Sequence, residues 1–253
     1  MTNIILSGCN GKMGRVITRL VNDDENVKIV AGIDIADFGE NDYPVFKNPA
    51  DCDIAADVIV DFSHPSVFSN LMEFAKAKKL PIIVATTGLS DEQREALKEY
   101  SRDIPVFFSA NMSLGINLLI ALAKKATAIL EGNFDIEVVE KHHNQKIDAP
   151  SGTAIAIADA ISETLTMTPE YVYDRHNVRK KREKREIGIH SIRGGSIVGE
   201  HQVIYAGQDE TIELKHQATS KEVFAVGAIK AAKFMNGKPS GFYTMDDLIG
   251  DAI

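Results

Sequence analysis

Hydrophobic and polar positions follow one pattern up to about residue 112 and another pattern after it. In the first region, short runs that are apolar almost throughout alternate with segments whose apolar residues recur three and four positions apart. The runs are typical of buried strands and the segments of surface helices. We expect strands at 3–8, 27–34, 56–62, 81–88 and 105–111, and helices at 13–22, 65–78 and 91–100.

The second region mixes long helical segments with alternating strands. Residues 113–130 predict one long helix with Leu118, Leu122 and Ile129 as its buried stripe, ended by Gly132. The other elements that we expect are a strand at 134–140, a helix at 151–165, antiparallel strands at 187–198, 200–207 and 210–218 joined by glycine turns, and a helix at 223–235 before a short tail.

These two patterns indicate two domains of different class. Strands that are apolar on both sides require helices on both faces of a parallel sheet, so the first region predicts a doubly wound, Rossmann-like α/β domain. The second region, residues 113–220, predicts a mixed α+β domain. A fold with one domain for a nucleotide and one for a substrate is consistent with this division.

Composition and charge exclude several classes of function. A net charge of −8 argues against nucleic acid or an anionic membrane as the main partner. No apolar run approaches the roughly 20 residues that span a bilayer, and the chain opens on a strand rather than a signal peptide. Two cysteines provide neither a disulfide framework nor a C-x-x-C metal motif. We expect a cytoplasmic protein that acts on a small molecule.

A glycine loop lies between the first strand and the first helix. Gly8, Gly11 and Gly14 in "GCNGKMGR" would let backbone N–H groups approach a pyrophosphate at a helix N-terminus. The G-x-x-G-x-x-G spacing is weak by itself, and a purely structural turn is the alternative. Asp34 follows twenty residues after Gly14, where an acid can bind the ribose hydroxyls. Together they favour a dinucleotide site.

The stretch "KHHNQKIDAPSGTA", residues 141–154, contains two histidines, a lysine, an aspartate and a Pro-Ser-Gly-Thr turn within fourteen positions. Adjacent histidines on a strand point to opposite faces, so His142 and His143 do not suit one metal ion, and we expect no metal. Two structural histidines without function remain an alternative. The favoured interpretation is a carboxylate pocket: Lys146 and His143 supply positive charge, the helix start at 151–153 supplies N–H and hydroxyl groups, and His142 donates a proton.

The run "RHNVRKKREKRE", residues 175–186, is strongly basic in an acidic chain. A solvated loop is the favoured interpretation, because charge runs usually are solvated. Attraction of an anionic substrate or cofactor is the alternative. No aromatic residues interleave with the charges, which argues against nucleic-acid binding.

The chain resembles the 4-hydroxy-tetrahydrodipicolinate reductase (dihydrodipicolinate reductase) family. The segment "EKHHNQKIDAPSGTA" fits that family's E-x-H-H-x-x-K-x-D-A-P-S-G-T-A signature. Further similar segments are spread over nearly the whole chain: "GCNGKMGR", "ATTGLS", "SANMSLGIN", "RGGSIVGEH" and "GKPSGFYTMDDLI".

The resemblance implies reduction of 4-hydroxy-tetrahydrodipicolinate to tetrahydrodipicolinate by hydride transfer from NADH or NADPH, in lysine biosynthesis through diaminopimelate. It implies a homotetramer, and a nucleotide domain of residues 1–112 joined by 221–253, with 113–220 binding substrate and forming the oligomer. His142 would be the general acid, with Lys146 binding substrate and sharing proton transfer. The implied ligands of the substrate carboxylates are His143, Lys146, Ser151, Gly152 and Thr153.

The resemblance also implies a set of cofactor contacts. Met112 stands where many relatives have phenylalanine. Asp34 is followed by Ile35, Ala36 and Asp37 rather than by the arginine of many NADPH-using relatives, which leaves Lys12 as the one nearby cation for a 2′-phosphate. The expected contacts are Gly8, Asn10, Gly11, Lys12, Met13, Gly14, Asp34, Ala85, Thr86, Thr87, Gly88, Ser109, Ala110, Asn111 and Met112.

Two other functions remain to be separated from this one. A nicotinamide-dependent reductase of similar architecture could act on a different small acid, although the carboxylate site at 146–153 argues against it. A dinucleotide-binding sensor without enzymatic activity would have no use for a proton donor, so His142 and Lys146 together argue against a sensor.

Overall fold

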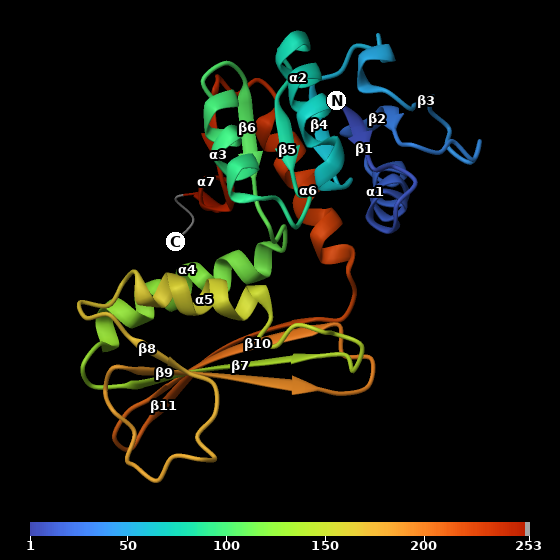
Figure 1. The fold of residues 1–253 in the computed structure, drawn as a ribbon. Coiled ribbons are helices and arrows are strands. Elements are labelled where there is room, and N and C mark those ends of the chain that lie inside the picture. The colour runs from blue at the N-terminus through green and yellow to red at the C-terminus, as the bar shows by residue number, and fades with distance from the viewer. Residues whose placement is uncertain (251–253) are drawn as a thin grey trace. The chain divides into compact units, whose positions relative to one another are not determined.

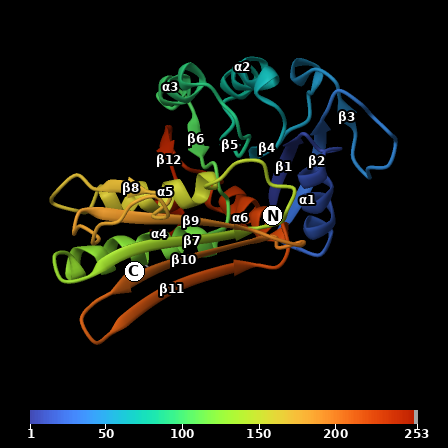
Figure 2. The same cartoon turned by 60° about the horizontal axis from the view of Figure 1, so that its bottom comes forward.

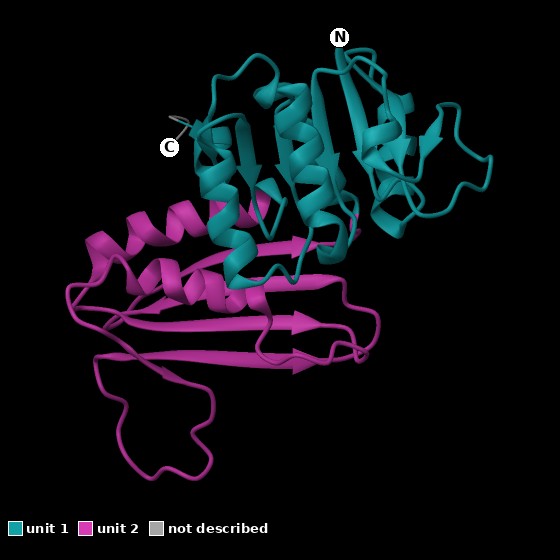
Figure 3. Cartoon of the chain, turned by 45° about the horizontal axis from the view of Figure 1, so that its top comes forward, with its two compact units in different colours: residues 1–114, 222–250 teal, residues 115–221, 251–253 magenta. Residues whose placement is uncertain are grey.

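The computed structural model describes residues 1–250 and divides into two compact units, coloured separately in Figure 3. Unit 1 comprises residues 1–114 and 222–250, and unit 2 comprises residues 115–221. The chain therefore leaves unit 1 after its sixth strand and returns to it with its last long helix (Figure 1).

Unit 1 is built around a seven-stranded sheet in which every pairing is parallel. Its order, β12-β6-β5-β4-β1-β2-β3, reverses direction at β1, which places a ligand crevice at the carboxyl ends of β1 and β4. The doubly wound prediction is confirmed. The strands are β1 Thr2–Ser7, β2 Val27–Ile33, β3 Val45–Phe46, β4 Val58–Asp61, β5 Ile82–Val84, β6 Pro105–Phe108 and β12 Gly241–Tyr243.

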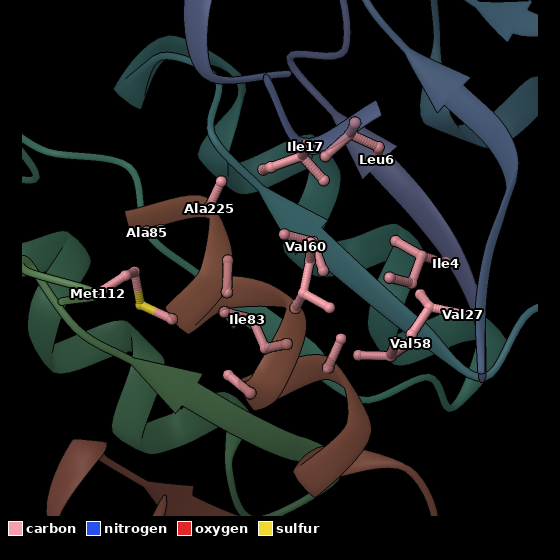
Figure 4. Packing of buried hydrophobic residues seen from close by; sticks show 14 of the residues in the cluster. Ile4, Leu6, Ile17, Val27, Val58, Val60, Ile83, Ala85, Met112 and Ala225 are labelled. Carbon is pink, nitrogen blue, oxygen red and sulfur yellow. The ribbon is translucent and has the colours of Figure 1, made fainter. Parts of the chain in front are cut away.

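Helices cover both faces of this sheet because its strands are apolar on both sides. Ile4, Leu6 and Val60 pack against Ile17 of α1 and Ala225 of α6 (Figure 4). The residues between them on the same strands pack against α2 and α3. The helices of unit 1 are α1 Lys12–Asn22, η1 Pro49–Asp51, η2 Pro65–Val67, α2 Phe68–Lys78, α3 Asp91–Tyr100, α6 Glu222–Met235 and α7 Met245–Ile249.

Unit 2 is a five-stranded mixed sheet with two helices on one face. Leu119 and Ala123 of α4 and Ile157 of α5 pack against Val138 and Val203 of the sheet. The strand order is β11-β10-β7-β9-β8, and Figure 2 shows the longer strands β11, β10, β7 and β9 running side by side. The elements are α4 Leu114–Leu130, β7 Asp135–His142, α5 Gly152–Ser162, β8 Glu170–Val172, β9 Glu186–Arg193, β10 Gly199–Ala206 and β11 Thr211–Ala218.

The strand pairing of unit 2 differs from the predicted run of antiparallel neighbours. β10 pairs antiparallel with β11, as expected, but its other neighbour is β7. β9 lies on the far side of β7 and runs parallel to it. The prediction was wrong for β9 because a strand's neighbour in the sheet is decided by tertiary packing and not by order in the chain.

The buried stripe predicted for α4 was also wrong. Leu118, Leu122 and Ile129 are 42%, 37% and 78% exposed. The buried face instead carries Ile116, Leu119, Ala123 and Thr127. The segment is apolar on most of its circumference, so 3.6-residue periodicity fits both faces and does not select one.

The predicted short tail contains two further elements of unit 1. β12 adds an edge strand parallel to β6, and α7 follows it. Thr244 is the N-cap of α7 (Met245–Ile249), and its backbone N–H and hydroxyl both donate to Asp247. Residues 251–253 lie outside the described part of the chain.

Candidate active site

The glycine loop of unit 1 is too closely packed for side chains at two positions. Gly8 has φ +77°, and a Cβ there would lie 2.6 Å from the Phe62 carbonyl oxygen. A Cβ at Gly14 would lie 2.2 Å from the Gly8 carbonyl oxygen. Gly11 is the N-cap of α1 and provides no side-chain cap, so N–H groups of the first helical turn are left for a ligand. These features fit a bound pyrophosphate.

A cavity of about 800 Å³ opens beside this loop, at the carboxyl ends of β1, β2 and β4. Gly8, Asn10, Gly11 and Asp34 line it, as a dinucleotide site requires. Asp34 is fixed by the loop, because its Oδ2 accepts a hydrogen bond from the Asn10 backbone N–H at 2.9 Å. The site therefore offers a carboxylate for ribose hydroxyls beside a cradle for phosphates.

Three residues of the glycine loop and first helical turn that were expected near the cofactor lie outside the lining of this cavity. Lys12 is exposed, Met13 packs against the hydrophobic core, and Gly14 is buried. Gly14 therefore shapes the loop by close packing. A cation that the sequence reasoning passed over, Lys47, lines the cavity directly.

Lys12 is not the one cation near the glycine loop, because Arg15 lies there as well. Its Nε donates to the Asn10 carbonyl oxygen at 3.1 Å, and its guanidinium lies 5.9 Å from the centre of the Phe38 ring. Asp37, the second acid after β2, accepts a hydrogen bond from the Gly39 backbone N–H and is not part of the cavity lining. Arg15 also pairs with Glu40 at 3.6 Å, so its charge is partly balanced there.

The loop after β5 is anchored to a buried acid. The Thr86 hydroxyl donates to Asp61 Oδ2 at 2.7 Å, and Asp61 is 2% exposed at the end of β4. Burial raises the pKa of Asp61, although the hydrogen bonds that it accepts oppose this effect. Ala85 is buried next to Thr86, whereas Thr87 and Gly88 are exposed.

The loop after β6 is held by its own hydrogen bonds. The Ser109 hydroxyl donates to the Asn111 carbonyl oxygen at 2.8 Å, and the Asn111 Oδ1 accepts from the Ser113 N–H at 2.9 Å. Ala110 is exposed at the tip. Met112 is 2% exposed with its side chain in the hydrophobic core (Figure 4). The side chain of Met112 therefore packs the fold, and only its backbone could face a cofactor.

In unit 2, the signature segment connects the end of β7 to the start of α5. Ser151 is the N-cap of α5, and its hydroxyl accepts a hydrogen bond from the Ala154 N–H at 3.1 Å. The same hydroxyl lies 3.0 Å from His201 Nε2, and Ser151 is 2% exposed. Ser151 as a substrate ligand stays a prediction; in this structure its hydroxyl is buried and both these partners are internal.

Glu140 is the centre of the polar cluster in unit 2. Its side chain is fully buried and accepts a hydrogen bond from His142 Nδ1 at 2.6 Å. It also accepts bonds from Arg193 Nη1 and Nη2, at 2.8 and 2.7 Å, and from the Ser151 N–H at 3.1 Å. Burial alone would raise the pKa of Glu140, but the bonds from Arg193 and His142 outweigh it and lower the pKa to about 2. Glu140 is therefore a permanent carboxylate.

This carboxylate orients His142. With Nδ1 bonded to Glu140, the nitrogen left for a substrate is Nε2. Nε2 faces Gly199, where a Cβ would lie 3.3 Å away, so glycine leaves that edge of the ring uncovered. The His201 ring packs edge-on against the His142 ring, with the ring centroids 5.2 Å apart. Burial lowers the pKa of His201 to about 4. His201 therefore adds no positive charge beside His142 at neutral pH.

The remaining predicted substrate residues lie along the same segment. Lys146 Nζ forms an ion pair with Asp148 Oδ1 at 2.9 Å. His143 is half-buried, and within residues 1–250 its side chain has no hydrogen bond. Gly152 is exposed and Thr153 half-buried at the first turn of α5, where an anion is stabilised by the helix N-terminus.

Sequence reasoning assigned no role to Glu140, Arg193 or His201. All three stand in segments that carried the resemblance: Glu140 opens the signature, and Arg193 and His201 lie in "RGGSIVGEH". They come from β7, β9 and β10, which are neighbours in the sheet. The similarity of those segments to the family was a signal for these three residues, but predicting that the residues meet requires the order of the strands in the sheet.

Part of the basic run is bonded to the sheet. Arg175 Nη2 and Arg182 Nε each donate to Glu137 Oε1 at 3.0 Å, and Arg182 also pairs with Asp135 at 2.9 Å. Glu137 accepts from His190 as well. The two arginines thus pair with acids of β7, and the Arg182 side chain is only 18% exposed, whereas Lys181 and Lys184 are exposed.

The described residues, 1–250, contain neither a membrane-spanning helix nor a cluster of metal-ligating side chains. None of the helices there has the length and apolar character needed to cross a membrane. The same residues contain no group of three or more histidine, cysteine, aspartate or glutamate side chains arranged to hold a metal ion.

The doubly wound sheet, the glycine cradle and the acid after the second strand define a dinucleotide-binding oxidoreductase fold with a separate polar cluster in its second unit. Comparison with known proteins gives the particular family. The family model for the dihydrodipicolinate reductase N-terminus matches residues 2–112, and that for the C-terminus matches residues 115–249. The chain belongs to the dihydrodipicolinate reductase family.

Relatives of known name agree over nearly the full length. The chain is 53% identical over 249 residues to 4-hydroxy-tetrahydrodipicolinate reductase of Clostridium novyi, and 51% identical to that of Caldanaerobacter subterraneus, with 98% of each chain covered. Its structure is similar to dipicolinate-bound dihydrodipicolinate reductase from Paenisporosarcina sp. TG-14, with a TM-score of 0.81 and 25% identity over 99% of this chain and 100% of that one. The resemblance inferred from the sequence is confirmed.

Proposed function

We propose that this protein reduces 4-hydroxy-tetrahydrodipicolinate to tetrahydrodipicolinate with NADH or NADPH, in lysine biosynthesis through diaminopimelate. The observation that carries the proposal is full-length similarity, in both halves of the chain, to relatives named for this reaction. The glycine cradle of unit 1 and the His142 cluster of unit 2 support it, because they offer a dinucleotide site and a proton donor.

Unit 1 would hold the cofactor. The N–H groups at Lys12 and Met13, in the loop shaped by Gly8 and Gly14, would bind the pyrophosphate, and Asp34 with Asn10 the adenosine ribose. The nicotinamide half would lie by the loops after β5 and β6. These loops contain Ala85, Thr86, Thr87 and Gly88, and Ser109, Ala110, Asn111 and the backbone of Met112. When bound, the nicotinamide supplies a hydride.

Unit 2 would hold the dicarboxylate and protonate it. Lys146 and His143 would pair with the substrate carboxylates beside the N–H groups of Gly152 and Thr153 at the start of α5, for which the Ser151 cap fixes the turn. Once the 4-hydroxyl has left as water, the ring is a conjugated imine, and a hydride added at its C4 would leave negative charge directed toward C3 and the imine nitrogen. His142 donates the proton that neutralises this charge from Nε2.

A coupled assay tests the proposal. The purified protein is mixed with the condensation product that precedes this step, and nicotinamide absorbance is followed with each cofactor. Oxidation of the cofactor at the rate of substrate loss is expected. No turnover with either cofactor would reject an enzymatic role and favour a sensor, and turnover only with other cyclic imines would favour a reductase for a different acid.

Lys146→Ala should raise KM for the substrate by about 10-fold or more, because a dianion loses a charge-assisted partner. Lys146 is paired with Asp148 and its side chain is 23% exposed, so its head group is close to solvent and within reach of a ligand. Steady-state kinetics measure the change. Asp148→Asn is the matched control, since it breaks the same ion pair while keeping the lysine, and should not raise KM. An unchanged KM in Lys146→Ala would make Lys146 structural.

We predict that NADH is used at least as well as NADPH. Asp34, positioned by the Asn10 N–H, accepts from the ribose hydroxyls of NADH and repels a 2′-phosphate, and Ile35 stands where an arginine could pair with that phosphate. The ratio of kcat/KM for the two cofactors measures the preference. A tenfold preference for NADPH would mean that nearby cations outweigh Asp34.

Three variants show which side chain controls that ratio. Ile35→Arg should move it toward NADPH. Lys47→Ala should lower kcat/KM for NADPH more than for NADH, because Lys47 lines the cavity next to Asp34. Lys12→Ala serves as comparison, since Lys12 is outside the lining and should affect both cofactors similarly.

We also propose a cytoplasmic homotetramer. Support comes from the family resemblance and from the sheet of unit 2, whose edge strand β11 has Ile212 38% exposed and an unpaired edge within the described chain. Sedimentation of the purified protein measures the oligomer, and a stable, active monomer would reject this part of the proposal.

A further inference from the structure

Glu140 and His142 stand two residues apart on β7, so their side chains share one face of the sheet. The Glu140 carboxylate has no exposure to water, and His142 is 12% exposed. A charge that is fully buried is tolerated only with strong partners, and the Arg193 guanidinium supplies them through two parallel hydrogen bonds. The His142 ring nitrogen thus contacts an anion whose own position is fixed.

We propose that Glu140, held by Arg193, is a positioning residue for His142. It keeps the proton of the hydrogen bond between the two side chains on His142 Nδ1, and it stabilises the charged ring. Nε2 is then the nitrogen that gives up a proton to substrate. This inference rests on the proposed role of His142 as proton donor. The inference goes further by assigning to Glu140 the control of the ring's orientation and charge, a role for which the sequence predicted no residue.

His201 does not compete with His142 as a charged imidazole. Its Nε2 forms a hydrogen bond with the Ser151 hydroxyl, 3.0 Å away, and that hydroxyl also accepts from the Ala154 N–H. Burial lowers the pKa of His201 to about 4, so its ring is neutral at neutral pH. The two imidazoles in contact thus have different partners, a carboxylate for His142 and a hydroxyl for His201.

The other charged groups near the ring come from the elements around it. Arg193 of β9 is committed to Glu140 and to the Asp148 carbonyl oxygen, at 2.6 Å. His216 of β11 and Lys146 lie near enough to His201 to disfavour its charged form. Lys141 points to the opposite face of β7 and pairs with Glu200. Among the described residues, Glu140 is the carboxylate that hydrogen-bonds the His142 ring.

A purely structural alternative is that Glu140 ties α5 to the sheet through the Ser151 N–H, 3.1 Å away. Glu140→Gln separates the two roles. The glutamine can keep its oxygen toward the Ser151 N–H and Arg193 Nη2, which places its NH₂ group against His142 Nδ1. The reversed amide would oppose two donors instead of one, so this orientation is favoured. The NH₂ group then donates to Nδ1, and the neutral His142 ring must carry its proton on Nε2.

The test uses ¹⁵N-labelled histidine in the full-length protein, with His142→Gln to assign the signals. In the parent protein the neutral ring should show the pattern of a proton on Nδ1, and in Glu140→Gln that of a proton on Nε2. Glu137→Gln is the matched control, because Glu137 lies on the opposite face of β7 and accepts from His190 at 2.8 Å. It should move the signals of His190 and not those of His142. An unchanged His142 tautomer in Glu140→Gln would overturn the proposal.

Kinetics provide the second readout. Glu140→Gln should lower kcat about 10-fold or more, because the proton-donating ring loses the carboxylate that fixes its orientation and balances its charge. Glu140→Asp, which keeps the carboxylate, should recover part of kcat. An unchanged kcat in Glu140→Gln would overturn the proposal. If instead His142→Gln itself leaves kcat intact, the role of His142 as acid fails, while the tautomer measurement still decides what Glu140 does.

Discussion

His142→Gln is expected to lower kcat by about 10²-fold or more, the usual effect of losing a general acid, with little change in KM. Glutamine can accept or donate a hydrogen bond at this position but has no proton that it can release at neutral pH. The side chain is bonded to Glu140 at one nitrogen and leaves the other uncovered beside Gly199, so its proposed task is proton transfer and not binding. Steady-state kinetics with saturating cofactor measure both parameters.

The neighbouring imidazole supplies the control for that experiment. His143 follows His142 directly but its side chain has no hydrogen bond within the described chain, and we propose that it pairs with a substrate carboxylate. His143→Gln should therefore raise KM and preserve most of kcat. If kcat of His142→Gln stays within about 3-fold of the parent, the loss is far below that of a general acid and the assignment is wrong.

Local signals in the sequence were sufficient for most elements of unit 1. The helix predicted at 91–100 is α3 Asp91–Tyr100, because Ser90 and Gln93 form a capping box that fixes its start. The parallel sheet followed from strands that are apolar on both faces. In such cases the information lies within a few residues of the element itself.

Long-range choices in unit 2 could not be predicted in the same way. The insertion of β7 between β9 and β10 depends on which strand edges meet, and each strand's own pattern is compatible with several neighbours. For α4, two apolar stripes satisfy the same periodicity, and only the sheet beneath selects Leu119 and Ala123 over Leu118 and Leu122.

The same limit applies to the polar cluster around His142. The signature segment predicted the histidines and Lys146 together, because they are close in the chain. Arg193 and His201 come from strands on either side of β7, so their meeting with Glu140 depends on the sheet order that periodicity missed. Lys47 was missed for a related reason, since it reaches the cavity from the segment after β3.

Gly14→Ala is expected to raise the dissociation constant for NADH by about 10²-fold, the effect of displacing a binding group by roughly 1 Å. A Cβ at this position would lie 2.2 Å from the Gly8 carbonyl oxygen and 2.4 Å from that of Cys9, distances that no unstrained structure allows. Both contacts are to backbone, so the loop itself must move away from α1. The N–H groups that would bind the pyrophosphate move with it. Fluorescence titration with NADH measures the change.

Gly11→Ala gives the graded comparison, because its Cβ would meet the same Gly8 oxygen at 3.2 Å and requires a shift of only a few tenths of an ångström. Its effect should be several-fold smaller than that of Gly14→Ala. Circular dichroism on both variants distinguishes a displaced loop from loss of the fold, since overpacking at Gly14 should cost about 1–3 kcal/mol of stability. If folded Gly14→Ala binds NADH within about 3-fold of the parent, the loop does not place the cofactor to within the 1 Å assumed here, and the glycines serve only the turn.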